Sequence, residues 1–365
     1  MTATIRQAAG SLLVVGLSGT ELTGLERAWL KLVRPSGIIL FRRNIAETGQ
    51  TRSLLSESTS YCQNFNLRCV DIEGGTVDRL RDAVAPMPSA QAVAQAAIRT
   101  GKPALMRRHG ELIAREALAF GFNTTLAPVL DLGLPESAAV MGTRAASSNP
   151  LDVVTYVRNF LAGLAAQGVV GCGKHFPGLG GGTLDSHLET PAIERSWAEL
   201  WGEDLVPYRQ LARVLPMVMV NHASYPKTRG GDCPATASAY WITTVLKKRI
   251  GYKGLIFSDD MEMGGILKVF PMEEAVVLAV RAGIHLMEIC HSPELILRGY
   301  EALIAEAERS ATFRELLLER AAFSGRLRRA RFGQPVPRAL SSAQLAALRD
   351  KVRIFAAEVE RSAPK

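Results

Sequence analysis

A glycine-rich segment, KHFPGLGGGTLDSH at residues 174–187, contains the residue types best suited to catalysis. Its Asp185 and His187 are separated by one residue, so the carboxylate can hydrogen-bond to the imidazole, raise its pKa and orient it for proton transfer. Gly178 and the glycines at 180–182 are typical of a loop that moves or approaches a ligand closely. No Gly-Lys-Ser/Thr follows, which excludes a Walker phosphate-binding loop. The segment therefore predicts a general acid/base carried on a loop.

Four short runs of apolar residues in this chain end in polar residues. Several polar strand ends on one face would form a polar pocket, whereas a single one, such as Asp260, could simply cap a helix. A carboxylate such as Asp259, with a separate proton donor and polar groups around it, suits glycoside hydrolysis, although isomerase and aldolase barrels share such parts. The polar strand ends are Asp71 and Glu73, Lys174 and His175, Asn221 and His222, and Ser258, Asp259 and Asp260.

Eight short apolar runs alternate with eight segments of helical spacing. The runs are continuous instead of alternating, as in buried parallel strands, and this order predicts a closed (β/α)8 TIM barrel of the α/β class. A doubly wound open sheet is the alternative, because alternation alone does not show closure. In a barrel, the predicted pocket lies at the carboxyl ends of the strands. The runs are 12–16, 37–41, 68–71, 124–129, 169–174, 216–221, 254–258 and 284–290, and the helical segments are 22–32, 48–65, 105–120, 151–167, 197–211, 240–250, 273–282 and 293–308.

The domain organisation follows from one break in the chain. No low-complexity linker occurs before residue 310, but Gly333–Pro337 reads GQPVP, and residues 341–359 have the spacing of one amphipathic helix. The sequence predicts a barrel domain over residues 1–335 and a C-terminal helical extension over residues 336–365.

Charge is concentrated near the C-terminus. The net charge is +8, and residues 314–338 contain seven arginines against two glutamates. Such a patch could meet nucleic acid or anionic lipid. Almost no aromatic residues are interleaved for base stacking, which favours a solvated helix face. We expect a monomer with no nucleic-acid or membrane partner.

The five cysteines are odd in number, widely spaced and without a CxxC motif. This argues against a disulfide framework and a zinc site, and for a reducing compartment. The apolar run 12–17 is only as long as a strand and follows a single basic residue, Arg6, so it does not resemble a signal peptide. The expectation is a cytoplasmic protein that needs neither a metal ion nor an organic cofactor.

The chain resembles the β-N-acetylglucosaminidases of glycoside hydrolase family 3, the single-domain bacterial type, from about residue 10 to about residue 308. Residues 174–187 match that family's motif, Lys-His-Phe/Ile-Pro-Gly-His/Leu-Gly-x4-Asp-Ser/Thr-His, without a gap. Shorter matches are GIILF at 37–41, DIEGG at 71–75, APVLD at 127–131 and SDDM at 258–261.

The resemblance implies a role for each matching residue. Asp259 corresponds to the nucleophile that forms a covalent glycosyl–enzyme, His187 to the general acid/base and Asp185 to its partner. It implies a retaining β-N-acetylhexosaminidase acting on terminal β-linked N-acetylglucosamine, with peptidoglycan fragments as the substrate class. The residues implied in binding this sugar are Asp71, Arg79, Arg144, Lys174 and His175.

Some positions depart from the family pattern, among them Thr76, Gly181 and His285. His285 stands where relatives commonly have an aspartate near the pocket, so we expect a sugar subsite to differ there. Two other functions stay open. A phosphorylase would use the same site, since a histidine acid/base repels phosphate less than a carboxylate does. A non-catalytic sugar-binding barrel would explain the departures as lost activity.

Overall fold

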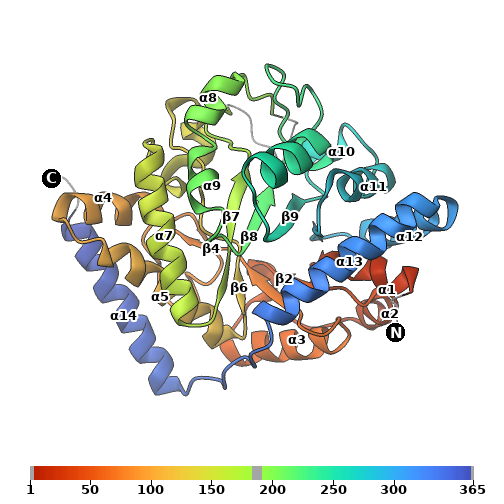
Figure 1. The fold of residues 1–365 in the computed structure, drawn as a ribbon. Coiled ribbons are helices and arrows are strands. Elements are labelled where there is room, and N and C mark those ends of the chain that lie inside the picture. Colours follow the sequence, from red (N-terminus) through yellow and green to blue (C-terminus); the bar gives the residue numbers. More distant parts are fainter. Residues whose placement is uncertain (1–3, 183–190, 363–365) are drawn as a thin grey trace.

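The computed structural model describes residues 4–182 and 191–362, and eight parallel strands in it close into a barrel (Figure 1). Each strand pairs with its two neighbours and the last pairs with the first, so the open-sheet alternative is wrong. Every apolar run predicted as a strand overlaps one. In order around the barrel they are β1 (Leu13–Val15), β2 (Gly37–Leu40), β3 (Leu67–Val70), β6 (Thr124–Thr125), β7 (Val170–Phe176), β8 (Met217–Val220), β9 (Leu255–Asp260) and β10 (Leu286–Ile289). Strands β3, β7 and β9 extend beyond the predicted bounds.

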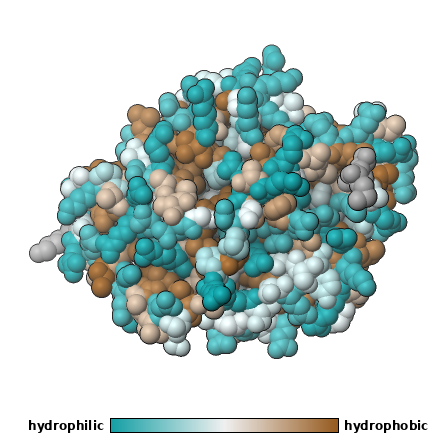
Figure 2. All heavy atoms as spheres, turned by 60° about the horizontal axis from the view of Figure 1, so that its bottom comes forward, coloured by the Kyte–Doolittle hydropathy of each residue, from teal (hydrophilic) through white to brown (hydrophobic). Residues whose placement is uncertain are grey.

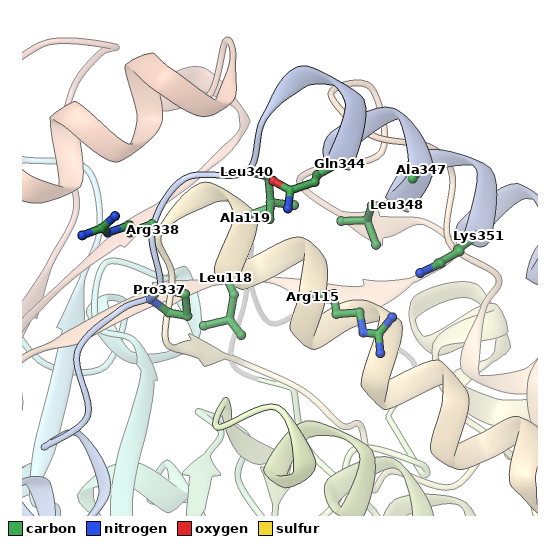
Figure 3. A pocket seen from close by; sticks show the side chains of 10 residues that line it. All are labelled: Arg115, Leu118, Ala119, Pro337, Arg338, Leu340, Gln344, Ala347, Leu348 and Lys351. Carbon is green, nitrogen blue, oxygen red and sulfur yellow. The ribbon is translucent and has the colours of Figure 1, made fainter.

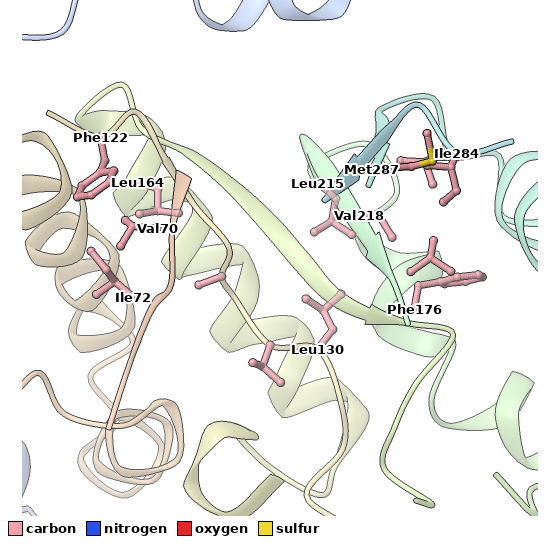
Figure 4. Packing of buried hydrophobic residues seen from close by; sticks show 14 of the residues in the cluster. Val70, Ile72, Phe122, Leu130, Leu164, Phe176, Leu215, Val218, Ile284 and Met287 are labelled. Carbon is pink, nitrogen blue, oxygen red and sulfur yellow. The ribbon is translucent and has the colours of Figure 1, made fainter. Parts of the chain in front are cut away.

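Both faces of these strands are covered by other side chains. One set fills the inside of the barrel, and a larger set packs between the strands and the surrounding helices, where Val70, Leu164 and Val218 lie (Figure 4). Strands buried on both faces have no polar side to expose, which explains their continuous apolar sequences. The interior set is Val14, Ile39, Leu67, Cys69, Leu126, Cys172, Met217, Met219, Leu255, Phe257, Leu286, Cys290 and Phe332.

Six predicted helical segments are single α-helices in the structure. The predicted segment 197–211 is divided into α8 (Trp197–Gly202) and α9 (Val206–Leu211), with Pro207 in the first turn of α9, where its missing N–H costs nothing. Residues Tyr240–Arg249 form a π-helix. The six are α2 (Gly24–Val33), α3 (Thr48–Ser60), α5 (Ala104–Phe120), α7 (Pro150–Ala166), α11 (Met272–Ala282) and α12 (Pro293–Arg309).

The structure also contains elements that the sequence did not predict. The longest of them is α4 (Ala90–Thr100), and the shorter helices are α1 (Ile5–Gly10), α6 (Ala138–Met141) and α10 (Gly264–Leu267). Helix α13 (Ala311–Arg331) contains most of the arginine-rich segment that the sequence analysis interpreted as a helix face. After β3, the antiparallel pair β4 (Ile72–Gly74) and β5 (Val77–Asp78) extends one wall above the barrel.

Helices α5 and α7 cross at a very short separation. A Cβ atom on Gly110 of α5 would lie 2.1 Å from the carbonyl oxygen of Phe160, and one on Gly163 of α7 would lie 2.2 Å from that of Arg107. The two glycines therefore allow the backbones of α5 and α7 to pack in direct contact.

The N-terminal end of the barrel is covered by the end of α13. Phe332 packs against the interior set, and the buried Arg328 donates to the carbonyl oxygen of Asn64 at 3.0 Å. The sequence analysis expected the arginines of residues 314–338 to form a solvated helix face. This is wrong for Arg328, which is buried and connects α13 to the barrel by its hydrogen bond.

The predicted C-terminal helix is present as α14 (Ser342–Arg361), which lies along α4 and α5 (Figure 1). It buries Leu348, Val352 and Phe355, and its Glu358 forms an ion pair with Arg108 at 2.7 Å. A groove of about 320 Å³ remains between α5 and residues 337–351 (Figure 3). On the face shown in Figure 2, hydrophilic and hydrophobic side chains are interspersed.

Two further expectations can be compared with the structure. All five cysteines are free thiols, in agreement with the predicted absence of a disulfide framework. Within residues 4–182 and 191–362, no helix is long and apolar enough to cross a membrane.

Candidate active site

A cavity of about 280 Å³ opens at the carboxyl ends of the strands. Of the eight candidate site residues, six line it: Asp71, Arg79, Arg144, Lys174, His175 and Asp259. Asp185 and His187 lie outside the described residues. The other lining residues are Phe41, Glu73, Val77, Leu126, Val140, Leu179, Met219, Asp260, Met263, Glu288 and His291.

One wall of the cavity is a charge-balanced network centred on Glu73. The Lys174 Nζ lies 2.9 Å from Asp71 Oδ1 and 2.8 Å from Glu73 Oε1. Arg144 donates two hydrogen bonds to Glu73, at 2.8 and 2.9 Å. Burial alone would raise the pKa of Glu73, but the charges of Arg144 and Lys174 outweigh it and lower that pKa. Two cations and two carboxylates are thus held in fixed positions.

Burial opposes the charge on Lys174 as well, but Asp71 and Glu73 outweigh it and raise the Lys174 pKa. Glu73 was noticed in the sequence only as a polar strand end, and its part as the shared partner of Lys174 and Arg144 follows from the structure.

Arg79 extends this wall toward the cavity mouth. Its Nη2 lies 3.7 Å from Asp71 Oδ2, and its guanidinium carbon lies 5.8 Å from the centre of the Phe41 ring. A third of its side chain is exposed. The short β5 strand places it there, since the Arg79 N–H donates to the Asp71 carbonyl oxygen.

His175 is oriented by the buried Asp131. The Nδ1 of His175 lies 2.6 Å from Asp131 Oδ2, and Asp131 also accepts from the backbone N–H groups of His175 and Leu179. The Nε2 faces Arg144 Nη2 at 3.4 Å. Asp131 thereby fixes both the imidazole and the start of the glycine-rich segment.

Asp259 lies next to the last residue of β9 and lines the same cavity. Burial would raise its pKa, but the neighbouring basic side chains, His175 foremost, outweigh burial and lower it. The backbone N–H of Asp260 donates to Asp259 Oδ1 at 3.0 Å. Asp259 is therefore ionised at neutral pH, as a carboxylate nucleophile must be.

Asn221 and His222, the polar end of β8, lie behind the cavity instead of lining it. Asn221 Nδ2 donates to the carbonyl oxygen of His175 at 3.1 Å, and His222 Nε2 lies 3.0 Å from that of Asp260. Both side chains therefore hold the strand ends that bear His175 and Asp259.

Sequence reasoning missed Glu288 and His291. Glu288 lines the cavity from β10, and burial together with the nearby Asp260 raises its pKa well above the usual range. His291 hydrogen-bonds to Asp260 and Glu262, which raise its pKa to about 9. The available signal for Glu288 was an acid inside the apolar run LMEI.

The departures from the family pattern lie away from the cavity. The prediction that His285 alters a sugar subsite is wrong, because His285 lies near the opposite end of the barrel. Its Nδ1 accepts from the Ile256 N–H at 3.1 Å, and its Nε2 lies 3.3 Å from Lys247 Nζ. Thr76 and Gly181 do not line the cavity either.

The two described ends of the glycine-rich loop meet at Asp204, in the break between α8 and α9. A Cβ on Gly178 would lie 2.8 Å from Asp204 Cβ, and Arg195 Nε lies 2.9 Å from Asp204 Oδ2. Burial raises the pKa of Asp204 to about 7. Asp204 thus holds both described ends of the loop together, and Leu179 at one of these ends lines the cavity.

Comparisons with known proteins agree with this geometry. The family described as the glycosyl hydrolase family 3 N terminal domain matches residues 4–320. A beta-hexosaminidase of Alkalilimnicola ehrlichii is 39% identical over 78% of this chain and 82% of its own length. The glycoside hydrolase family 3 beta-N-acetylglucosaminidase of Paenibacillus sp. str. FPU-7 has a TM-score of 0.86 at 28% identity, over 97% of this chain and 69% of its own. Native NagZ from Neisseria gonorrhoeae has a TM-score of 0.78 at 27% identity, over 97% of this chain and 98% of its own.

Proposed function

Because the chain belongs to glycosyl hydrolase family 3 and is a glycoside hydrolase of the β-hexosaminidase type, we propose that it removes terminal β-linked N-acetylglucosamine through a covalent bond to Asp259. The observation that carries this proposal is an ionised carboxylate at a strand end, facing a fixed array of charged hydrogen-bonding groups in a cavity the size of one sugar.

The proposed reaction has two displacements at the anomeric carbon. Asp259 attacks this carbon while the bond to the leaving oxygen breaks, and His187 gives that oxygen a proton. His187 then takes a proton from water, which attacks the same carbon and breaks the bond to Asp259. Two inversions retain the anomeric configuration. Asp185 supports the charge and orientation of the imidazole.

The cavity wall opposite Asp259 would bind the sugar. Lys174, Arg144 and Arg79 offer donors, Asp71 offers acceptor oxygens, and the Nε2 of His175 offers a further hydrogen-bonding atom, which together match hydroxyl and N-acetyl groups. Because Glu73 and Asp131 already hold Lys174, Arg144 and His175, little side-chain entropy is lost when the sugar binds.

The family resemblance supports peptidoglycan fragments as the natural substrates and the cytoplasm as the place of action. The free cysteines are compatible with a reducing compartment. We also propose that the enzyme is a monomer and needs no cofactor for hydrolysis.

The test compares release of p-nitrophenol from its β-N-acetylglucosaminide and its β-glucoside, with and without inorganic phosphate. We expect the first substrate to be strongly preferred, with free N-acetylglucosamine as product at any phosphate concentration. Turnover that depends on phosphate and yields the sugar 1-phosphate would instead show a phosphorylase. A fluorinated sugar that labels a peptide without Asp259 would contradict the covalent intermediate proposed here.

A further inference from the structure

A groove of about 320 Å³ lies between α5 and the start of the C-terminal extension (Figure 3). None of its lining residues lines the cavity of the candidate active site. One of its walls, residues 337–351, lies beyond residues 4–320, which the family match covers. The proposed hydrolysis therefore does not account for this groove.

Each of the two helices borders the groove with one stripe of side chains, because residues three and four positions apart share one face of a helix. Arg115 and Lys351 lie at one end of the groove and Arg338 at the other, with Leu118 and Leu340 between them (Figure 3). The groove is thus apolar in the middle and basic at both ends. The α5 stripe is Arg115, Leu118 and Ala119, and the α14 stripe is Gln344, Ala347, Leu348 and Lys351.

Contacts outside the groove hold its two walls in place. The Arg52 guanidinium donates to the carbonyl oxygen of Leu118 at 3.0 Å and also to that of Pro337. The ion pair between Arg108 and Glu358 joins α5 to α14 a second time, at 2.7 Å. The groove is therefore formed before a ligand enters it, which lowers the entropy cost of binding.

The positive charges of the groove have no counter-charge. No acidic residue lines it, and within residues 4–182 and 191–362 the side chains of Arg115, Arg338 and Lys351 form no ion pair or hydrogen bond. By contrast, Arg107 on α5 and Arg353 on α14 each have an acidic partner on the same helix. An anion is therefore the ligand whose charge complements this groove.

The middle of the groove exposes hydrocarbon to water. Leu340 has 37% of its surface exposed, and Leu118 on the facing helix is only partly buried. Covering these side chains with an apolar chain is favourable, because it removes apolar surface from water. An anion that carries such a chain therefore fits the groove better than inorganic phosphate does.

The size of the groove favours a small ligand. Its volume of about 320 Å³ is at the lower end of the range of ligand pockets, about 300–1,000 Å³. A protein partner, or a second copy of this chain, needs about 800 Å² of surface on each side. Most of that surface would lie outside the groove and away from its three cations.

We propose that the groove binds a free fatty acid, with the carboxylate between Arg115 and Lys351 and the hydrocarbon chain over Leu118 and Leu340. Two cations meet at this end and only Arg338 lies at the other, which sets the direction of the chain. Guanidinium and ammonium groups both form strong hydrogen bonds to a carboxylate. Because α14 forms one wall, a bound fatty acid also stabilises the docking of α14 on α5. This binding does not depend on the proposed hydrolysis.

The first experiment tests the charged end of the groove. The full chain is titrated by calorimetry with decanoate, below its micelle concentration, and with decanol, which has the same chain length without the charge. We expect one decanoate per chain, bound about two- to fivefold more weakly in each of Arg115→Gln and Lys351→Gln. Decanol binding should not change in these variants. Arg353→Gln removes an exposed cation of α14 that does not line the groove, so this matched control should bind decanoate as the parent does.

The second experiment tests the apolar middle. Leu340→Ser should weaken the binding of decanoate and of decanol alike, by about threefold or more, because both ligands cover this side chain. Leu151, on α7, is 60% exposed and does not line the groove, so Leu151→Ser is the matched control and should bind both ligands as the parent does. Melting temperatures without ligand show that each variant is folded. At one decanoate concentration, the melting temperature should rise more for the parent than for the double variant Arg115→Gln/Lys351→Gln.

Four results would overturn the proposal. Decanoate binding could be unchanged in the double variant, or the parent could bind decanoate no more tightly than decanol. A dimer that Leu340→Ser dissociates would assign the groove to a second copy of the chain. Recruitment to phosphatidylglycerol vesicles that Lys351→Gln abolishes would assign it to a membrane surface.

Discussion

Glu73 determines the charge balance of the cavity, because Arg144 and Lys174 both depend on it and all three are largely buried. Glu73→Gln leaves two cations with one carboxylate. Removing one partner from a buried ion pair typically costs about 3–5 kcal/mol, so we expect a loss of that order in the free energy of unfolding at pH 7, measured with urea. Glu111→Gln, which breaks the exposed pair with Arg107, should cost less than about 1 kcal/mol.

The same contact predicts a pH dependence. The folded-state pKa of Glu73 lies below its usual value, so its stabilisation is present above about pH 4.5 and is lost as the pH falls further toward the folded-state pKa. The difference in unfolding free energy between the parent and Glu73→Gln should therefore shrink from pH 5 to pH 3. A difference that stays constant over this range would show that the Glu73 charge is not the cause.

Asp259→Asn tests the proposed nucleophile while the side chain keeps nearly the same size and shape. The amide cannot form the covalent intermediate, and loss of a catalytic nucleophile typically lowers kcat by about 10³-fold or more. The variant should keep the parent's melting temperature, since Asp259 faces the cavity and not the core. A variant that keeps a tenth of the parent's kcat on an activated aryl glycoside would rule Asp259 out.

The loss of rate in His187→Ala should depend on how much the leaving group needs a proton. General acid catalysis is typically worth about 10²–10⁴-fold, so hydrolysis of a sugar–sugar linkage should fall within that range. The glycosylation step of a dinitrophenyl glycoside should change much less, because dinitrophenolate needs no proton. Asp185→Ala should show a weaker form of the same pattern. Equal slowing of all substrates would make His187 a binding or structural residue.

At the level of single residues, the sequence predicted the cavity where a polar side chain ends an apolar run. That rule found Asp71, Lys174, His175 and Asp259. It failed for Asn221 and His222, which do not line the cavity, and it missed Glu288, which lies inside its strand. The His285 expectation came from the family pattern instead, and it was wrong because a residue just before a strand lies at the opposite end of the barrel from one just after it.

Among the elements, the crossing of α5 and α7 allows a controlled test. Gly163→Ala places a methyl group against the Arg107 carbonyl and should lower the free energy of unfolding by about 1–3 kcal/mol or more. Gly325→Ala is the matched control. Gly325 lies in α13, and its new Cβ would meet nothing within 4 Å, so this variant should gain about 0.5–1 kcal/mol. Urea unfolding measures the change in unfolding free energy of each variant, and changes of the same sign would contradict the close crossing.

The sequence predicted the helices that bury one face and the strands that are buried on both faces. All eight strands and six helices follow from apolar spacing. Helix α4 escaped detection because its buried residues are mostly alanines, whose apolar signal is weak. The division of segment 197–211 was missed because the buried Asp204 lies in the break, and a tertiary contact of this kind leaves no periodic pattern.

For the whole molecule, α14 provides a test of the predicted domain boundary. A chain that ends after residue 335 would expose the surface of α4 and α5 that Leu348, Val352, Phe355 and Val359 now cover. A fully buried side chain of this kind is worth about 1.5–3 kcal/mol. We therefore expect a clearly lower melting temperature and binding of a hydrophobic dye, whereas a chain that ends after residue 362 should behave as the parent. Equal melting temperatures would make residues 336–365 a dispensable appendage.

The buried side chains inside the barrel, Phe332 among them, have a consequence for the order of events in the proposed reaction. Among the described residues they leave no passage from the cavity to the N-terminal end of the barrel. If the proposed removal of a terminal sugar holds, that sugar enters the cavity first, and the remainder of the substrate must withdraw before the sugar can leave. We therefore expect an enzyme that removes one sugar per encounter and acts distributively instead of processively.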